Sequence, residues 1–340
     1  MLRAAIVGLG WWGETLVDAV RDSAAVRFTA ASTRSRSERD QAFCRDRGLK
    51  LADSFEALLQ DREIDALVLA TPPLGHLDQV VAAAKAGKHV FCEKPFMMNK
   101  AEAEAAVAAV EAAGVTLGLG YNRRFHPSWI DLKRRVRSGE LGTILHMECA
   151  MSGPNALSMS QEAWRAQADQ APCGGLFPMG VHGIDGFIDM AGPVGQAFCQ
   201  SLHRAAPVEN DDTTSILFKM AAGMSAYLVT MTATVGSFRF QVYGSKAMAM
   251  LGGATHVAGQ SSHQRRAGLF GSYMIQPVKG ETEWVEVPAF DVNAAELEAF
   301  AAAAAGGAPY PIPHAEMIQG VAATDAVIAS ARSGQPEAVQ

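Results

Sequence analysis

Cysteine is scarce in this sequence, and the few cysteines form no recognisable framework. The chain of 340 residues contains five of them, an odd number, and no two have the C-x-x-C spacing. This pattern argues against a disulfide framework and against a zinc ribbon. We therefore predict no metal site, and we expect reduced thiols in the core of a cytoplasmic protein at Cys44, Cys92, Cys149, Cys173 and Cys199.

The sequence also lacks a long hydrophobic run and a strong charge of one sign. The alanine-rich stretch at residues 300–307 is much shorter than the roughly 20 residues that span a bilayer. A strand pattern begins at residue 3, so we expect no signal peptide. The formal net charge of −6 is small for this length, which gives no reason to expect binding to nucleic acid or to a membrane surface.

Length and pattern indicate two domains, the first with a doubly wound parallel sheet. A chain of 340 residues exceeds one comfortable domain. Its first 120 residues or so alternate helical patterns with short apolar strands, and we count six strands. Such alternation is typical of a parallel sheet with helices on both faces. The predicted strands include residues 3–8, 26–32, 64–70 and 115–120, and the predicted helices are residues 14–22, 38–47, 54–60, 76–86 and 101–113.

A glycine-rich turn follows the first predicted strand. Gly8, Gly10 and Gly13 have the G-x-G-x-x-G spacing between a strand and a helix, which is the context that dinucleotide binding requires. The first glycine permits the tight turn, the second lets the backbone approach a pyrophosphate, and the third lets the helix pack closely on the strand. Trp11 and Trp12 are unusual in so tight a loop. We expect one to pack in the core and the other to line a nicotinamide pocket.

The end of the second predicted strand favours NADP over NAD. A NAD-preferring site usually has an acid there to hold the ribose hydroxyls. Here the sequence is Ser32-Thr33-Arg34-Ser35-Arg36. Arginine can bind a 2′-phosphate through two hydrogen bonds, whereas a carboxylate would repel it. The alternative is a solvated basic loop with no ligand, and NAD remains possible.

Two further loops follow predicted strands of the same sheet. Thr71-Pro72 ends one strand, with His76 at the start of the next helix, and Glu93-Lys94-Pro95 ends another. Ligands of open parallel sheets bind beyond the carboxyl ends of the strands, so Lys94 is our first candidate for chemistry. The alternative is a surface Glu–Lys pair.

The pattern changes after residue 121, where we place the domain boundary. Residues 1–121 are the predicted dinucleotide-binding Rossmann domain, and residues 122–340 are the predicted substrate-binding and oligomerisation domain. Runs of strands without regular intervening helices, between residues 194 and 287, indicate a large, open, mostly antiparallel or mixed sheet in an α/β domain. Residues 293–305 and 314–332 are predicted to close the chain as helices.

A glycine-flanked histidine is the candidate acid/base group of the second domain. In the stretch Gly180-Val181-His182-Gly183-Ile184-Asp185, a helix would project the imidazole of His182 from its first turns. Histidine titrates near neutral pH, as the acid and base of an alcohol/ketone couple should. The alternative is a buried, hydrogen-bonded histidine with a structural role.

Together these motifs resemble the Gfo/Idh/MocA oxidoreductases, relatives of glucose-fructose oxidoreductase and inositol dehydrogenase. The resemblance rests on the glycine turn, Thr71-Pro72 with His76, residues 86–95, residues 121–124 and residues 180–185, and covers nearly the whole chain. It implies NAD(P)-linked oxidation or reduction of an alcohol or carbonyl group on a sugar, cyclic polyol or related small molecule. It also implies a homo-oligomer, a dimer or tetramer.

The resemblance assigns roles by position. Lys94 would polarise the reacting oxygen and His182 would exchange its proton. Substrate contacts are expected from Arg123, Trp164 and Asp185. Cofactor contacts are expected from Gly8, Gly10, Trp11, Trp12, Gly13, Ser32, Thr33, Arg34, Thr71, Pro72, His76, Glu93, Lys94, Asn122 and Arg165.

One position departs from the family pattern. Many members have an aspartate four residues before the histidine, where this chain has Pro178. Proline can neither bind substrate through a carboxylate nor tune the imidazole. Two alternatives to a dehydrogenase stay open. One is a dinucleotide-binding regulator that has lost the chemistry. The other is a glycosidase that uses bound NAD transiently, as in one branch of the family.

Overall fold

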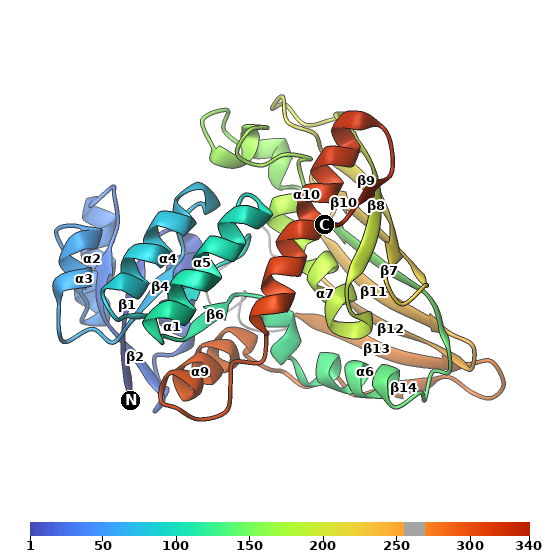
Figure 1. Ribbon diagram of the computed structural model, residues 1–340, viewed down its shortest axis with the longest axis horizontal. Coiled ribbons are helices and arrows are strands. Elements are labelled where there is room, and N and C mark those ends of the chain that lie inside the picture. The colour runs from blue at the N-terminus through green and yellow to red at the C-terminus, as the bar shows by residue number, and fades with distance from the viewer. Residues whose placement is uncertain (255–268) are drawn as a thin grey trace. The chain divides into compact units, whose positions relative to one another are not determined.

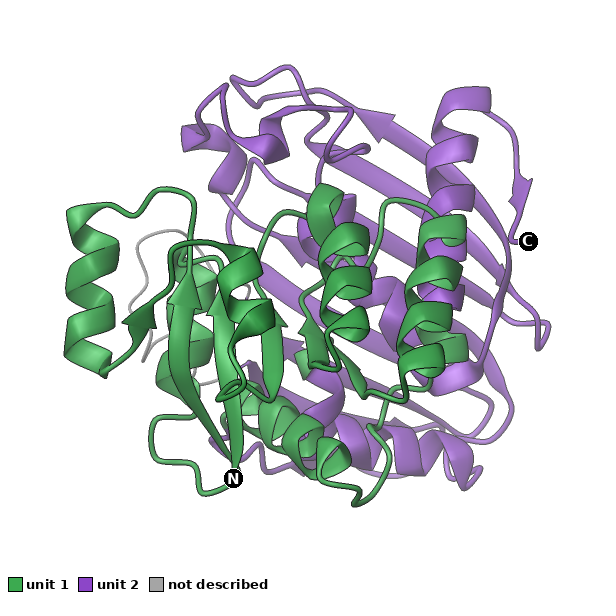
Figure 2. Ribbon diagram, turned by 60° about the vertical axis from the view of Figure 1, so that its left-hand side comes forward, with its two compact units in different colours: residues 1–122, 291–317 green, residues 123–290, 318–340 purple. Residues whose placement is uncertain are grey.

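The computed structural model describes residues 1–254 and 269–340, which form two compact units. Unit 1 comprises Met1–Asn122 and Asp291–Met317, and unit 2 comprises Arg123–Phe290 and Ile318–Gln340 (Figure 2). Residues 291–317, which the predicted division gave to the second domain, therefore pack with unit 1. In the part of the chain that is described, no helix is long and apolar enough to cross a membrane.

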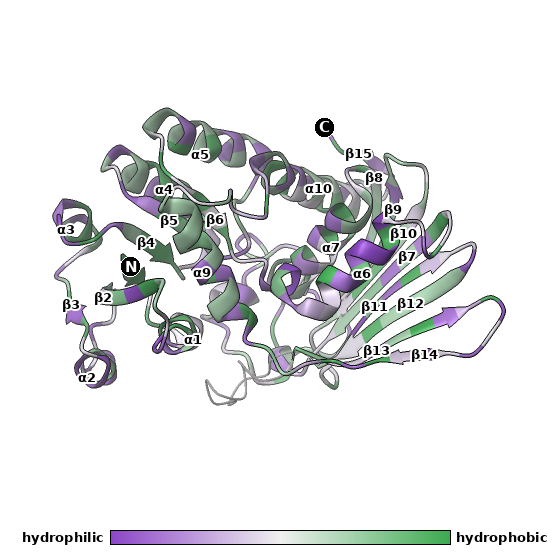
Figure 3. Cartoon of the chain, turned by 90° about the horizontal axis from the view of Figure 1, so that it is seen from below, coloured by the Kyte–Doolittle hydropathy of each residue, from purple (hydrophilic) through white to green (hydrophobic). Residues whose placement is uncertain are grey.

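Unit 1 contains a six-stranded parallel sheet in the order β3-β2-β1-β4-β5-β6. This order is that of the doubly wound dinucleotide-binding fold and confirms the prediction. The central strand β4 is entirely buried and is among the strongly hydrophobic strands in Figure 3. The strands are β1 (Leu2–Val7), β2 (Val26–Ser32), β3 (Lys50–Leu51), β4 (Ala66–Leu69), β5 (His89–Cys92) and β6 (Leu117–Leu119).

Local signals fix most helix ends of unit 1. The Ser37 hydroxyl accepts from the backbone N–H of Asp40, whose carboxylate accepts from the backbone N–H of Ser37, and Gly48 ends that helix with φ of 66°. Asn99 caps another helix, which ends at Gly114 with φ of 64°. The helices are α1 (Trp11–Ala19), α2 (Glu38–Arg47), α3 (Phe55–Gln60), α4 (His76–Lys85), α5 (Lys100–Ala113) and α9 (Val292–Ala304) (Figure 1).

The first helix begins earlier than the sequence predicted. We expected it from residue 14, but α1 begins at Trp11. Trp11 and Trp12 therefore lie in its first turn and not in the loop, and their rings meet edge to face with centroids 5.3 Å apart.

Unit 2 contains a nine-stranded sheet in the order β14-β13-β12-β11-β7-β10-β9-β8-β15. Among the described strands of this nine-stranded sheet, only β7 and β10 pair in parallel, so the predicted open, mostly antiparallel sheet is confirmed. The strands are β7 (Ile144–Ser152), β8 (Val194–Leu202), β9 (Thr213–Met220), β10 (Ser225–Met231), β11 (Ser237–Gly244), β12 (Ala247–Gly253), β13 (Phe270–Pro277), β14 (Glu283–Val285) and β15 (Glu337–Ala338).

Two helices pack on this sheet and enclose an aromatic core. Helix α6 (Pro127–Arg137) contacts β12, and α7 (Val181–Ala191) contacts β7 and β10. The ring centroids of Trp129 and Phe240 are 4.8 Å apart, and those of Phe240 and Phe187 are 5.5 Å apart. The last helix, α10 (His314–Ser333), starts in unit 1 and ends in unit 2.

Candidate active site

The structure explains differently why each of the three positions in the turn after β1 is a glycine. Gly8 has φ of 99°, and a Cβ there would lie 2.7 Å from the Ala70 carbonyl oxygen. A Cβ at Gly13 would lie 2.0 Å from the Gly8 carbonyl oxygen. Both are therefore required by the fold. A Cβ at Gly10, however, would meet nothing within 4 Å.

The space at Gly10 fits a dinucleotide. Gly10 is the N-cap of α1, and no side chain caps that helix end, so its first N–H groups remain available to an anion. The fold does not need a glycine at this position, whereas close approach of a pyrophosphate does. The residues present thus fit a bound NAD or NADP at this turn.

Three arginines lie in or just after the basic loop that follows β2, and they differ in whether their guanidinium groups have partners. Arg36 binds the Ala52 carbonyl oxygen at 3.0 Å and pairs with Asp53 at 3.1 Å. Arg39 pairs with Glu14 of α1 at 2.7 Å. Arg34 is exposed and has no ion pair or side-chain hydrogen bond with any described residue. Of these three arginines, only Arg34 therefore has a guanidinium group without a partner among the described residues.

A buried carboxylate organises the same loop. Asp40 accepts hydrogen bonds from the Ser35 hydroxyl and from the backbone N–H of Ser37 at 2.9 Å. Burial opposes its ionisation, but these hydrogen bonds and nearby Arg39 lower the pKa of Asp40 overall. The loop that presents Arg34 is thus fixed onto α2 at Ser35 and Ser37.

His76 holds two loops of unit 1 together. Its Nδ1 lies 3.0 Å from the carbonyl oxygens of both Pro95 and Phe96, and its Nε2 lies 2.9 Å from that of Thr71. The side chain is fully buried, and this burial lowers the pKa of His76 despite the backbone hydrogen bonds. The predicted cofactor contact of His76 is therefore better described as indirect, because the imidazole positions the Thr71-Pro72 and Glu93-Lys94-Pro95 loops.

Glu93 and Lys94 lie directly after β5, at the carboxyl edge of the sheet. The Glu93 carboxylate accepts from the Trp12 indole N–H at 2.6 Å and from the backbone N–H of Lys94 at 3.1 Å. A Cβ at Gly120 would lie 2.8 Å from this carboxylate, so the glycine makes room for it. Burial raises the pKa of Glu93, an effect that Lys94 and the Trp12 hydrogen bond oppose. Lys94 itself is partly exposed, and the Lys94–Pro95 peptide bond is cis.

In unit 2, His182 lies in the first turn of α7, as the sequence predicted. A π-helical turn at Leu176–Gly180, which includes Pro178, leads into the helix. The His182 side chain is largely buried, with 8% of the residue exposed. Its glycine neighbours serve packing, because a Cβ at Gly183 would lie 2.7 Å from Leu228 and one at Gly186 would lie 2.8 Å from Trp129.

Asp185 binds an arginine of its own unit. The Nε of Arg124 donates to both Asp185 carboxylate oxygens at 3.0 Å, and its Nη2 lies 2.5 Å from one of them. Arg124 also pairs with Asp189 at 3.0 Å, and Asp189 accepts from the Trp129 indole N–H at 2.8 Å. All these groups are buried. The Asp185 carboxylate therefore already has a structural ion pair, which would compete with the predicted substrate contact. The i,i+4 spacing of Asp185 and Asp189 is a sequence signal for such a pair.

Two other arginines of unit 2, Arg123, which is buried, and Arg165, which is half-buried, lack carboxylate partners among the described residues. The Arg123 guanidinium lies 5.1 Å from the centroid of the Phe238 ring, and burial lowers the pKa of Arg123 to about 10. The Arg165 guanidinium lies 4.6 Å from the Trp164 ring centroid, and burial lowers its pKa too. The Nε atom of each arginine has no hydrogen-bond partner in the part of the chain that the structure describes. Both can therefore receive a polar ligand.

Asn122 faces Asn293 within unit 1 and donates to its side-chain oxygen at 2.9 Å. This contact fixes the start of α9 against the end of the first chain segment. The predicted cofactor contact of Asn122 remains a prediction.

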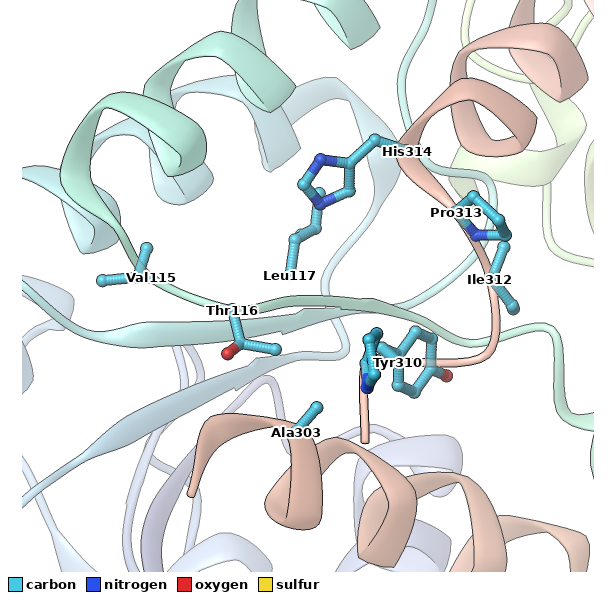
Figure 4. Close-up of a pocket in the computed structure, with 9 residues that line it drawn as sticks. Val115, Thr116, Leu117, Ala303, Tyr310, Ile312, Pro313 and His314 are labelled. Atoms are coloured by element: carbon cyan, nitrogen blue, oxygen red, sulfur yellow. The ribbon is translucent and has the colours of Figure 1, made fainter. Parts of the chain in front are cut away.

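The depression in Figure 4 lies elsewhere in unit 1. It has a volume of about 330 Å³ and is lined by Thr116, Leu117, Ala303, Tyr310 and His314, among others. Because Thr116 and Leu117 are at the amino end of β6, the depression is at the edge opposite to the one where such sheets bind ligands. We do not assign the active site to it. Among the described residues, no group of histidine, cysteine and acidic side chains could hold a metal ion.

Comparison with known proteins gives matches along most of the chain. Residues 2–121 match the oxidoreductase family model with an NAD-binding Rossmann fold, and residues 129–250 match the GFO/IDH/MocA C-terminal domain. An inositol 2-dehydrogenase of Rhodococcus erythropolis is 35% identical over 156 residues, 45% of each chain. A scyllo-inositol 2-dehydrogenase (NAD(+)) of Bacillus subtilis is 34% identical over 146 residues, 42% of each chain. The chain thus spans less than half the length of these two curated relatives.

Solved structures agree over the full length. A putative NADPH-dependent oxidoreductase of Desulfitobacterium hafniense has a TM-score of 0.91 at 23% identity, covering 99% of this chain and 97% of that one. A levoglucosan dehydrogenase in complex with NADH has a TM-score of 0.83 at 19% identity, covering 100% and 99%. At these identities the likeness establishes the fold.

Proposed function

Because the chain belongs to the Gfo/Idh/MocA oxidoreductase family, we propose that it is an NAD(P)-dependent dehydrogenase or reductase acting on CH–OH groups. Its substrate is a sugar, cyclic polyol or related small molecule. The observation that carries this proposal is the open space at Gly10 beside an uncapped helix N-terminus, at the same sheet edge as Lys94. A nicotinamide bound there would accept or supply the hydride.

In this proposal Lys94 and His182 are the acid/base groups. The ammonium group of Lys94 stabilises negative charge that develops on the reacting oxygen. His182 takes up or returns the proton of that oxygen. Arg123, with a buried guanidinium and no carboxylate partner in the described chain, anchors the substrate, and Trp164 lines its pocket.

We propose NADP as the preferred cofactor. Arg34 is exposed and uncommitted next to Ser32 and Thr33, and no acid stands at the end of β2 to repel a 2′-phosphate. The names of similar proteins do not decide between the cofactors, since one mentions NADPH and another NADH. The remaining cofactor contacts are proposed at Gly8, Gly10, Trp11, Trp12, Gly13, Thr71, Pro72, Glu93, Lys94, Asn122 and Arg165.

The substrate class follows the relatives, with one qualification from this chain. Inositol, sugar and anhydrosugar names recur among the similar proteins. Pro178 stands where many members have aspartate, so this chain lacks one carboxylate that could accept hydrogen bonds from substrate hydroxyls. We therefore propose a substrate that is less polar than a free hexose.

We also propose that the chain is a cytoplasmic homo-oligomer that associates through the open face of the unit 2 sheet. Phe198, Leu217 and Tyr227 are register neighbours across β8, β9 and β10, and Met250, Met274 and Trp284 are neighbours across β12, β13 and β14. Phe198, Leu217 and Trp284 are 40%, 51% and 68% exposed, respectively. Glu148 of β7 and Gln241 of β11 lie between these two apolar groups in the same register. Exposed apolar groups of this kind are typical of an interface. The five unpaired cysteines suit a reducing compartment.

Sedimentation tests the interface. Leu217→Glu should shift the protein toward the monomer, because it would bury a charge between two sheets. Val235→Glu is the matched control, because Val235 is 76% exposed and lies between β10 and β11. An unchanged oligomer in Leu217→Glu would refute this interface.

Calorimetric titration with NADPH and NADH, followed by a polyol and carbonyl panel, tests the activity. We expect preferential NADPH binding, and Arg34→Asp should weaken it about tenfold or more while sparing NADH. Arg27→Asp, an exposed change on β2, is the control. Lys94→Ala should depress turnover by about 10²–10⁴-fold and cofactor affinity much less.

The same experiments separate the alternatives. Tight cofactor binding without turnover of any substrate would favour a regulator, the alternative suggested by Pro178 at the usual aspartate position. Sugar release without net cofactor reduction would favour the glycosidase. Binding of neither cofactor would exclude the oxidoreductase and the regulator together.

A further inference from the structure

Helix α9 carries a buried acid that the proposed mechanism does not use. Glu296 has an exposed fraction of 0%, and neither of its carboxyl oxygens has a hydrogen-bond partner among residues 1–254 and 269–340. A carboxylate ion enclosed in this way, with no donor, would lose its hydration and gain nothing in return. The enclosed group is therefore stable only as the neutral acid.

The position of Glu296 on the helix places it near the Glu93-Lys94 turn. Phe300, one helical turn later, packs edge to face on Phe91 of β5 at 5.7 Å, and a Cβ at Gly118 of β6 would lie 2.9 Å from its ring. Residues four apart share a helix face, so Glu296 also faces the sheet. The charged groups that act on it are Glu93 and Lys94, after β5, and Asp291, before α9 itself.

The two acids are both buried but differ in their donors. Burial raises the pKa of Glu93 to about 7, but its carboxylate accepts from Trp12 and from the Lys94 backbone and is attracted by the Lys94 ammonium group, all of which favour its ion. Glu296 has no hydrogen-bond donor within the described segments and faces the negative charges of Glu93 and Asp291. Burial raises the pKa of Glu296, and repulsion by these two carboxylates raises it further. When two neighbouring acids differ in this way, one proton is retained by the pair on the group with fewer donors.

We propose that Glu296 is a positioning residue that stays protonated near neutral pH, so that Lys94 faces the single negative charge of Glu93 and not two. This inference rests on the proposed function, because it assigns the effect to the acid/base role of Lys94. A second negative charge at the turn would offset the ammonium charge of Lys94 and weaken its stabilisation of negative charge on the reacting oxygen. An apolar residue of the same size would be easier to bury, and buried groups that cost stability are commonly retained at functional sites.

Unfolding as a function of pH tests the proton directly. An unfolded glutamate ionises near pH 4.3, whereas the folded acid keeps its proton to a higher pH. Between those two values the folded chain binds one extra proton, so raising the pH favours unfolding by about tenfold per pH unit. In Glu296→Gln this contribution should vanish, so its unfolding constant should rise less steeply between pH 6 and 8 than that of the unaltered chain.

The matched control is Glu298→Gln on the same helix, since Glu298 is exposed and accepts from the Ser23 hydroxyl at 2.7 Å. Its slope should equal that of the unaltered chain. Glu296→Met, of similar volume and also without a titratable group, gives the same comparison if the glutamine variant does not fold. Equal slopes in the Glu296 variant and the unaltered chain would overturn the inference.

The pH profile of kcat/KM tests the effect on Lys94. Glu296→Gln should keep activity within a few-fold at pH 7, and its decline at alkaline pH should begin at higher pH than in the unaltered chain. An unchanged onset would also overturn the inference. If the unaltered chain turned over no substrate, the proposed function would fail, while the unfolding slopes would still decide whether Glu296 holds the proton.

Discussion

The Trp12 indole N–H donates to the Glu93 carboxylate at 2.6 Å, and this bond joins two motifs that lie 81 residues apart in the sequence. One partner belongs to the helix after the glycine turn, and the other belongs to the turn that presents Lys94. The proposed cofactor loop and the proposed catalytic turn are thus parts of one hydrogen-bonded assembly within unit 1.

Replacing Trp12 tests this connection. Trp12→Phe keeps the aromatic bulk but leaves the buried Glu93 carboxylate with one donor fewer, so the free energy of unfolding should fall by about 1–3 kcal/mol. Denaturant titration measures the change. Trp11→Phe is the control, because Trp11 is 43% exposed and has no hydrogen bond to Glu93, and it should have a smaller effect. Equal losses in both variants would argue that ring packing matters and the bond does not.

Substitutions at the glycines of the turn should separate effects on folding from effects on cofactor binding. Gly10→Ala should fold with an unchanged melting temperature, because its φ is −73° and the new methyl group meets no protein atom within 4 Å. It should nevertheless bind NADPH at least tenfold more weakly, because the methyl group occupies the space of the pyrophosphate. Gly13→Ala should lower the melting temperature, since its Cβ would collide with the Gly8 carbonyl. Calorimetry and thermal scans test both, and normal cofactor affinity in Gly10→Ala would count against the proposed cofactor site.

Breaking the Arg124–Asp185 pair should destabilise the protein. The two side chains are 3% and 4% exposed, and loss of one partner of a buried pair typically costs about 3–5 kcal/mol. We therefore expect Asp185→Asn to lower the free energy of unfolding by about 3 kcal/mol. Glu104→Gln, which removes the more exposed pair of Glu104 with Lys100, should cost less than about 1 kcal/mol. If Asp185→Asn kept full stability but raised KM, Asp185 would be a substrate contact after all.

His76 should make stability depend on pH on the acid side. Burial lowers its pKa in the folded chain, so below about pH 6.5 the unfolded chain binds a proton that the folded chain does not. Its contribution to stability is therefore complete above pH 6.5 and is lost as the pH falls toward the folded pKa. His76→Gln should flatten the fall in unfolding free energy between pH 6.5 and 5. His89 and His126 shift in the same direction, so the slope should decrease and not disappear. A slope as steep as that of the unaltered chain would contradict this assignment.

The sequence by itself determined the local elements of this protein and the doubly wound fold. Helix α2 occupies the predicted residues 38–47 because Ser37 and Gly48 are local start and stop signals. Strand β2 likewise occupies the predicted residues 26–32. The glycine turn, Lys94 after a strand and His182 in a first helical turn could also be predicted, because each depends only on spacing within one short segment.

The tertiary structure decided which polar side chains are committed to the fold. Asp185 pairs with Arg124, and His76 binds backbone carbonyls 19 and 20 residues away. Glu296 is buried without a hydrogen-bond partner among the described residues, although the sequence of its segment predicts only an ordinary alanine-rich helix. Strand β15 lies outside residues 194–287, where strands were predicted, and was also missed. These outcomes depend on partners far apart in the sequence, and a local pattern cannot specify which groups folding brings together or removes from water.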